Sequence, residues 1–437
     1  MTLAWLQKIL FCQAFVANSI VSALPGYNVF NFRDASGELE TRQLPDSTSP
    51  NLPVPSNSEC GTGAGATNCE QVISGYNRLP YEGASVGLSS QLGLFLVEPC
   101  GVFWMSSDSN SGDMYGNLEI LGSILISSTD GAAPLQGTQS SQNYGWIYVG
   151  SGGSLVVNDV GTKSTATVNW SPTEVINKGL IQMNLYADAT TNTGSTGTIS
   201  SSGNITNTGI ISFTQIAPAG GTYEITTTSS DSSIYNYGTI YMANISTFQV
   251  PQNVYGTGCW VVESNTGLSI SNSESGNSNP NEAQPWLGQS VYLSSSTSSL
   301  EFPSNDFDYE YLGLSLYGWG NGNRIVLPSQ PSQLNYLSEK LEFSLGNDQV
   351  QIKVGAGYQN SSIQVNQING GWAISYNGAT PEQDLPSQCQ SVPPLLGLWP
   401  TVSDTNPNTF LPEGCPPISV PSTGELPYYR IARLIFN

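Results

Sequence analysis

Short apolar segments separated by glycine, serine and asparagine dominate the chain from about residue 85 onward. VGLSSQLGLFLVE and LEILGSILIS are two examples, in which apolar residues form brief runs or alternate with polar ones. Such patterns are typical of β-strands, and no segment shows the apolar spacing of an amphipathic helix. The pattern therefore predicts an all-β protein.

One short phrase recurs at a fixed interval in this region. Asn177, Asn207 and Asn236 lie 30 and then 29 residues apart, and each is followed two positions later by a glycine (Gly179, Gly209 and Gly238). Alignment on these residues gives three apolar columns: Val175, Ile205 and Ile234; Ile181, Ile211 and Ile240; Met183, Phe213 and Met242. A fixed period with aligned apolar columns indicates a solenoid.

A parallel β-helix explains why the phrase must repeat. Equivalent positions of successive coils stack about 4.8 Å apart, so apolar residues fill the interior and each asparagine can bond the next. We expect the glycines to supply the positive φ of a tight bend. A β-propeller is the alternative, but its blades need about 40 residues and four strands each.

Weaker versions of the phrase extend the series in both directions. Gly122-Ser-Ile-Leu and Gly153-Ser-Leu-Val resemble earlier coils, and Asn265-x-Gly267 resembles a later one whose apolar pair is shifted by one position. Beyond residue 285, segments such as KLEFSL and QVQIKVGAGY indicate an antiparallel β-sandwich packed on the end of the solenoid. We therefore divide the chain into a signal peptide (1–23), an irregular N-terminal arm (24–84), a parallel β-helix (85–285), a β-sandwich (286–378) and a Pro-rich, disulfide-tied tail (379–437).

The first 23 residues have a lysine, an apolar stretch and small residues at the end, which predicts a secretory signal peptide and a secreted chain. Of seven cysteines, Cys12 lies in this peptide, and the even number that remains implies disulfide bonds. Spacing favours Cys60–Cys69 and Cys389–Cys415 as local bridges, and Cys100–Cys259 as a long-range one. Other pairings stay open, because six cysteines allow many connectivities.

Charge and composition exclude several classes of function. The 32 acidic and 11 basic residues give a net charge of −21, and loss of Lys8 with the signal peptide makes it −22. The basic residues are scattered singly, so nucleic acid is a poor partner. The chain contains no histidine, which excludes Ser-His-Asp and Cys-His catalysis and the usual zinc motifs. We expect no cofactor, no membrane-spanning segment and a monomer.

Three groups of residues are candidates for chemistry, binding or modification. Asp306 and Asp308, with Glu310, share a strand-like spacing that could place carboxylates on one face for glycoside cleavage or calcium binding, although a solvated acidic loop explains them as well. Among the aromatic residues, Tyr235, Tyr237 and Tyr241 are more simply core residues, whereas Trp319 lies in a glycine-rich turn and could be exposed. Asn-x-Ser/Thr sequons predict N-glycosylation at Asn169, Asn204, Asn244 and Asn360.

The segment LYGWGNGNRIVL (316–327), together with the Asn-x-Gly-x-Ile phrases, YGTGCWVVESNTGLSI and VGAGY, resembles a known family. It is similar to the N-terminal domain of the fungal hyphally regulated cell-wall proteins and to the related yeast adhesin-like wall proteins, from about residue 85 to 378. The resemblance implies a right-handed β-helix followed by a β-sandwich, displayed on the cell wall by a Ser/Thr-rich stalk with a glycolipid-anchor signal. It supplies no catalytic residues.

The chain ends at RIARLIFN with neither stalk nor anchor signal, so it is either part of a longer protein or a freely secreted member of that group. We expect a non-enzymatic adhesin or cell-wall glycoprotein domain whose partners are wall or host-surface glycans or proteins. A carbohydrate-active enzyme with paired carboxylates and a purely structural wall component are the alternatives.

Overall fold

The structure is a computed structural model of the 437-residue chain. It describes residues 29–33, 39–43, 70–73, 76–81, 94–107, 117–128, 145–159, 167–186, 194–216, 220–251, 253–271, 286–303, 313–346, 348–378, 381, 386–389 and 415. The chain forms two units, 1–58 and 59–437. In the first, β1 (Val29–Arg33) and β2 (Leu39–Gln43) form an antiparallel pair. The predicted signal peptide lies outside the described residues.

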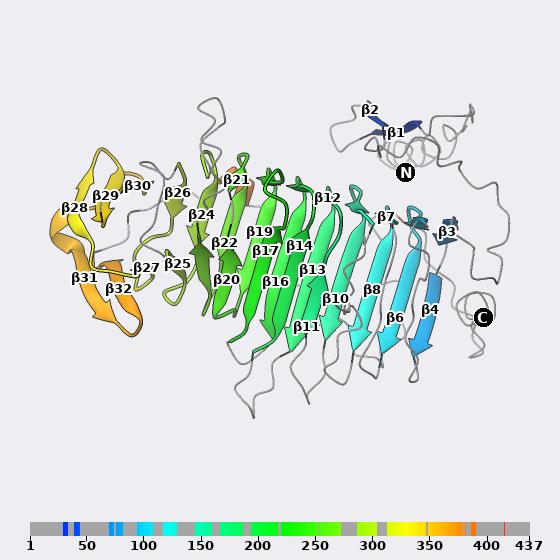
Figure 1. Cartoon of the computed structure of the whole chain (residues 1–437), viewed down its shortest axis with the longest axis horizontal. Helices are drawn as coiled ribbons and strands as arrows, with labels where there is room; N and C mark the ends of the chain where they lie inside the picture. Colours follow the sequence, from blue (N-terminus) through cyan, green and yellow to red (C-terminus); the bar gives the residue numbers. More distant parts are fainter. Residues whose placement is uncertain are drawn as a thin grey trace, which may run out of the picture. The chain divides into compact units, whose positions relative to one another are not determined.

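In the second unit, successive strands alternate among three sheets as the chain winds (Figure 1). The eight-stranded sheet contains β3 (Glu70–Ile73), β5 (Leu94–Val97), β7 (Asn117–Ile120), β9 (Ile147–Val149), β12 (Val175–Asn177), β15 (Ile205–Asn207), β18 (Ile234–Asn236) and β21 (Val254–Tyr255). The nine-stranded sheet contains β11 (Thr167–Trp170), β14 (Thr196–Ser201), β17 (Thr222–Thr227), β20 (Thr247–Val250), β23 (Gly267–Ile270), β25 (Ser299–Glu301), β27 (Arg324–Leu327), β32 (Gly371–Tyr376) and β31 (Ile363–Ile368).

The third sheet has thirteen strands and runs beside the other two. It contains β4 (Tyr76–Tyr81), β6 (Val102–Ser107), β8 (Ser123–Ser128), β10 (Ser154–Asp159), β13 (Leu180–Tyr186), β16 (Ile210–Ile216), β19 (Thr239–Ala243), β22 (Cys259–Val262), β24 (Ser290–Leu293), β26 (Ser315–Tyr317), β30 (Asp348–Lys353), β29 (Lys340–Leu345) and β28 (Ser332–Leu337). Two short 3₁₀ helices, η1 (Asn360–Ser362) and η2 (Ser387–Cys389), are the helical elements of the described residues.

The register of these sheets confirms the predicted parallel solenoid. Val175 pairs with Ile205, and Ile205 with Ile234. The other two apolar columns pair in the same way on β13, β16 and β19. The glycine phrases at 122 and 153 belong to earlier coils of the same series, since Ser123 pairs with Ser154 and Ser154 with Leu180.

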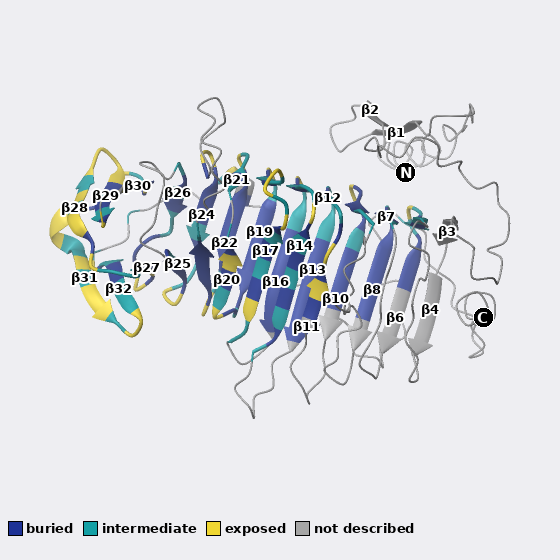
Figure 2. Ribbon diagram, in the orientation of Figure 1, coloured by how far each residue is buried: buried dark blue, intermediate teal, exposed yellow. Residues whose placement is uncertain are grey.

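Inward-facing side chains from the three sheets form one continuous apolar core (Figure 2). Large rings fill part of it: Phe213 contacts Tyr223 and Phe248, and Phe248 contacts Trp260, with ring centroids 4.9–6.5 Å apart. Because one coil cannot bury its own inner face, each depends on its neighbours for this packing.

Parallel pairing continues past residue 285, through β24 to β26 in one sheet and through β25 to β27 in another. The later strands then join these same sheets: β30 pairs with β26, and β32 pairs antiparallel with β27. The predicted C-terminal sandwich is therefore not confirmed. The alternating patterns of the sequence do form antiparallel strands, but these strands extend the solenoid sheets and share their core.

The glycines of the repeat have a different role from the one predicted. Gly179, Gly209 and Gly238 do not have a positive φ. Instead, a Cβ atom on Gly209 would overlap the carbonyl oxygen of Gly179, and one on Gly238 would overlap that of Gly209. Glycine is needed because each coil lies directly against the backbone of the preceding coil.

Substitution Gly209→Ala should therefore destabilise the protein by about 1–3 kcal/mol, the usual cost of overpacking. Gly220→Ala is the matched control, because its Cβ would lie 3.5 Å from the nearest atom and its φ is not positive. The control should leave stability unchanged or raise it by about 0.4–1 kcal/mol. Urea unfolding monitored by fluorescence compares the two; equal midpoints would contradict the close-contact explanation.

Candidate functional site

The repeated asparagines form a hydrogen-bonded ladder inside the solenoid. Asn177 Nδ2 donates to Asn207 Oδ1, and Asn207 Nδ2 donates to Asn236 Oδ1, each at 2.8 Å. The second amide hydrogen of each residue bonds a backbone carbonyl in the next coil, Ile210 O at 2.9 Å and Thr239 O at 3.3 Å. All three side chains are fully buried. The structure thus brings together the asparagines that the sequence pattern selected.

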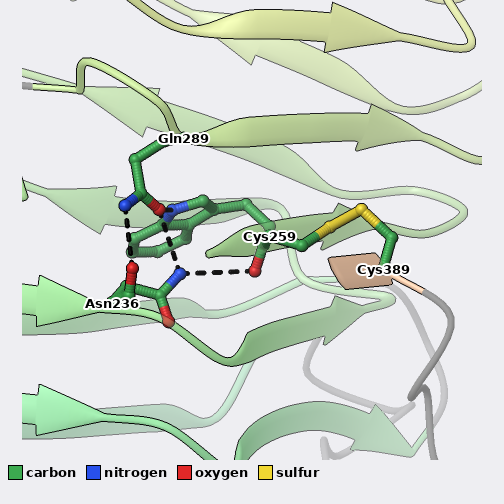
Figure 3. Close-up of a disulfide and its surroundings, with 5 residues drawn as sticks. Asn236, Cys259, Gln289 and Cys389 are labelled. Atoms are coloured by element: carbon green, nitrogen blue, oxygen red, sulfur yellow. Dashed lines mark hydrogen bonds between the residues drawn. A yellow bond between two sulfur atoms is a disulfide. The ribbon is translucent and has the colours of Figure 1, made fainter. Parts of the chain in front are cut away.

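Gln289 ends the ladder, although it lies outside the repeated phrase and was not predicted. Asn236 Nδ2 donates to Gln289 Oε1 at 3.1 Å, and Gln289 Nε2 returns a bond to Asn236 O at 2.9 Å (Figure 3). Trp260 Nε1 donates to the same Oε1 at 2.9 Å. Gln289 reaches Asn236 across the intervening coil because Gly258 has no side chain in the way. A sequence signal existed, since Gly258-Cys-Trp repeats Gly238-Thr-Ile after 20 residues.

Asn265 and Gly267 do not continue the ladder, contrary to the sequence expectation. Gly267 lies on β23 of the nine-stranded sheet. Asn265 has a φ of 54° and donates from Nδ2 to Asn244 Oδ1 at 3.3 Å. The expectation failed because this coil is shorter than the preceding two, so a count of 29 residues reaches a different sheet.

The disulfide pairs differ from those that spacing favoured. Cys100 is bonded to Cys415, and Cys259 to Cys389, with Cα atoms 5.4 and 5.3 Å apart. Cys389–Cys415 and Cys100–Cys259 are therefore wrong; Cys60 and Cys69 lie outside the described residues. Nearness in sequence was misleading because a solenoid places residues 315 and 130 positions apart against each other.

The Cys259–Cys389 bridge covers part of the outer face of the thirteen-stranded sheet. Cys259, Cys389, Val261 and Tyr241 form a small buried apolar cluster there (Figure 3 shows the bridge). Burial and the nearby Glu263 carboxylate both raise the pKa of the Tyr241 hydroxyl. Tyr241 is thus a packing residue, as the simpler sequence interpretation had it.

Trp319 is not the exposed aromatic that the glycine-rich turn suggested. It is fully buried, with its ring centroid 5.1 Å from that of Tyr358 and 5.7 Å from that of Tyr376. Tyr358 Oη also donates to Trp319 O at 2.7 Å. The prediction failed because Tyr376 of β32 and Tyr358, in the segment between β30 and η1, pack against Trp319. Asp306, Asp308 and Glu310 lie outside the described residues.

The described carboxylates of the nine-stranded sheet do not form a close pair. Glu224 and Glu301 occupy one outward row, and Gln249 and Ser269 lie between them. Three strand steps of about 4.8 Å separate them by roughly 14 Å, whereas glycosidase carboxyls are about 5–10 Å apart. Burial raises the pKa of Glu224. No group of His, Cys, Asp and Glu suited to a metal ion occurs within the described residues.

The four sequon asparagines have different surroundings. Asn169 is exposed on β11, and Asn204 Oδ1 accepts a bond from the Ser233 N–H at 2.9 Å. Asn244 Nδ2 donates to Gln215 O at 3.0 Å, and Asn360 Nδ2 donates to Tyr336 O at 3.0 Å. Glycosylation at these positions stays a prediction.

Three tyrosines gather outside the coils where the eight-stranded sheet meets the thirteen-stranded one; we call Tyr235, Tyr237 and Tyr255 the tyrosine corner. Tyr235 and Tyr255 pair on β18 and β21, with ring centroids 5.7 Å apart and planes 31° apart. Tyr237 follows the ladder residue Asn236 and has 50% of its surface exposed. Figure 2 shows exposed positions along this edge of the coils. Tyr237 was interpreted from the sequence as a core residue, and Tyr255 was not among the candidate residues.

Removal of one ladder residue should destabilise the whole body. Asn207→Ala removes the hydrogen-bond acceptor of Asn177 Nδ2 and the donor to Asn236 Oδ1. Each buried polar group that loses its partner costs about 1–3 kcal/mol. Thr208→Ala is the control, because Thr208 is the exposed neighbour on the same corner. Urea unfolding should show a lower midpoint for Asn207→Ala alone. A midpoint equal to that of wild type would mean that the ladder does not stabilise the fold.

The disulfide assignment predicts both a peptide map and a stability change. Proteolysis without reduction should release one peptide pair containing Cys100 and Cys415 and another containing Cys259 and Cys389. The double variant Cys259→Ser/Cys389→Ser should lose about 2–5 kcal/mol and keep the first pair. A Cys389–Cys415 peptide in the native protein would contradict the structure.

The chain matches known proteins over most of this body. Residues 90–397 match the family model described as hyphally regulated cell wall protein N-terminal. The chain is 28% identical over 223 residues to hyphally regulated cell wall protein 4 of Candida albicans, a match that covers 47% of this chain and 17% of that protein. It therefore spans about a sixth of that relative's length. Among the described residues, no helix is long and apolar enough to cross a bilayer. The chain belongs to the family of hyphally regulated cell-wall proteins, and residues 90–397 form the N-terminal domain of that family.

Proposed function

We propose that this chain is a non-enzymatic effector domain of a fungal cell-wall glycoprotein and acts at the cell surface in adhesion or wall structure. Family membership over residues 90–397 carries the proposal. The related Candida protein is also named as a cell-wall protein. The sequence predictions of secretion through residues 1–23, of N-glycans and of a monomer belong to the same proposal.

The physical design of the body supports a role in display. Each coil is fixed to the next by main-chain pairing and by the shared apolar core, and the buried asparagine ladder adds to this from Asn177 to Gln289. These central coils resist local opening, because a coil that separates there leaves buried amides unpaired. A stiff body can present exposed corner residues at constant spacing, which favours recognition of an extended or repetitive surface.

The enzymatic alternative receives less support. Glu224 and Glu301 are too far apart for a two-carboxylate mechanism. The family and relative are named as wall proteins and carry no enzyme name. Absence of histidine also leaves the chain without the common general base.

A pull-down with the purified secreted chain tests the proposal. We expect saturable retention on isolated fungal walls or on host epithelial cells, and no release of reducing sugars or unsaturated products from a polysaccharide panel. The Asn207→Ala variant, which weakens the ladder, provides a folding-dependent control and should be retained less. Absence of retention on every surface, or steady release of sugar products, would refute the proposal.

A further inference from the structure

The tyrosine corner concentrates exposed apolar surface that the fold does not explain. The large hydrophobic side chains most exposed among the described residues are Tyr237 and Leu287, each 50% exposed, and Leu337 at 57%. Leu287 lies on the coil after Tyr255, because Gly288, the next residue, lies against Gly256 and Thr257. Tyr237 is the one of the three that belongs to the tyrosine corner, and Tyr235 and Tyr255 beside it are partly exposed. Contiguous exposed apolar surface of this kind marks interaction sites.

The preceding coils show that the solenoid does not need aromatic residues here. Lys178, Thr208 and Tyr237 occupy the same corner position, and their backbone N–H groups donate in turn to Val149 O, Asn177 O and Asn207 O at 2.7–2.8 Å. Likewise, Ile176 pairs with Thr206 and Thr206 pairs with Tyr235 on the adjoining strands. Lysine, threonine and isoleucine all satisfy the same backbone geometry. The tyrosines are thus additions to the coil and not requirements of it.

The Tyr237 ring also lies against the backbone of the following coil. Gly256 has a φ of 103°, and a Cβ atom at this position would overlap Asn236 O and lie 3.1 Å from Tyr237 Cδ1. The backbone therefore requires glycine at 256, and the Tyr237 ring lies close beside it. Tyr255 directly precedes this glycine and stacks with Tyr235. The three rings therefore lie next to one another on two successive coils.

The chemistry of the corner favours a neutral sugar chain. Exposed tyrosine faces stack on the C–H face of a pyranose, and their hydroxyls bond to sugar hydroxyls. Thr206, Thr208 and Thr257 add hydroxyl groups around the rings. These flanking side chains are uncharged, and the net charge of −21 disfavours anionic polymers.

Among neutral sugars, β-linked glucose fits best. Its hydroxyl groups are all equatorial, so both faces of the ring present C–H groups, whereas the axial hydroxyl of mannose interrupts one face. Successive coils lie about 4.8 Å apart, which is close to the length of one sugar unit in an extended chain. We propose that Tyr235, Tyr237 and Tyr255 form a binding platform for a β-linked glucan chain. This inference rests on the proposed function and names the surface that performs it.

Isothermal titration of the purified secreted chain with a β-1,4-linked glucose hexasaccharide, a β-glucan whose chain is extended, tests the platform. The key variant is Tyr235→Thr/Tyr237→Thr, which copies Thr206 and Thr208 of the preceding coil and so preserves the fold. Leu337→Ala is the matched control, because it removes an exposed hydrophobic side chain on β28, away from the corner. Thermal unfolding checks that both variants remain folded.

We expect saturable binding to wild type and to Leu337→Ala, at least ten-fold weaker binding to the double tyrosine variant, and weaker binding of a mannose hexasaccharide or a polyuronate. No binding to wild type, equal binding to the double variant, or a preference for mannose or the polyuronate would overturn the proposal. The pull-down on walls and cells distinguishes failure of the platform from failure of the proposed function. If the double variant is retained like wild type, the platform alone is rejected. If wild type is retained on no surface, the proposed function is rejected.

Discussion

The fixed register between coils is the constraint on which this structure depends. The buried amide groups of Asn177 and Asn207 are satisfied from the next coil, by the equivalent asparagine and by a backbone carbonyl. An unpaired buried amide costs about 1–3 kcal/mol, and a slip of one residue would turn every inward side chain outward. The ladder therefore holds Val175, Ile205 and Ile234 in one column, and the glycines that follow allow the backbones to approach.

Such a ladder needs an end, and the parts of the chain without periodicity supply it. Gln289 has the same amide group as asparagine on a longer side chain, so it reaches Asn236 over Gly258 and also accepts a bond from Trp260. Directly beside this point, Cys259 is linked to Cys389. The last coils are covered in turn by antiparallel strands that extend the same sheets. The regular repeat therefore ends where Gln289, the Cys259–Cys389 bridge and the antiparallel strands begin to cover the coils.

The repeated part of the chain could be predicted from the sequence, whereas most of the non-repeated part could not. The solenoid, its columns and the residues of the ladder were predictable, because stacking makes neighbours of residues that recur at equal intervals. Gln289 did not follow from the repeat interval, since it lies 53 residues from its partner, and the signal that leads toward it, Gly258-Cys-Trp after Gly238-Thr-Ile, has a spacing of 20 residues instead of 29 or 30. The Cys100–Cys415 bridge and the burial of Trp319 depend on where later segments return, which no local pattern encodes. Only part of the tyrosine corner could be predicted, because Tyr237 adjoins the repeat whereas Tyr255 belongs to the shortened coil.

Interior and exterior positions of a solenoid are subject to different constraints. An inward position must match the coils on both sides, so its residue type is nearly fixed by packing. A corner position only needs to leave its backbone N–H free to pair, and Lys178, Thr208 and Tyr237 all meet that condition. Side-chain chemistry can therefore change along the corner without cost to the core. Because the fold leaves that choice open, an aromatic cluster exposed there is better explained by a partner than by stability.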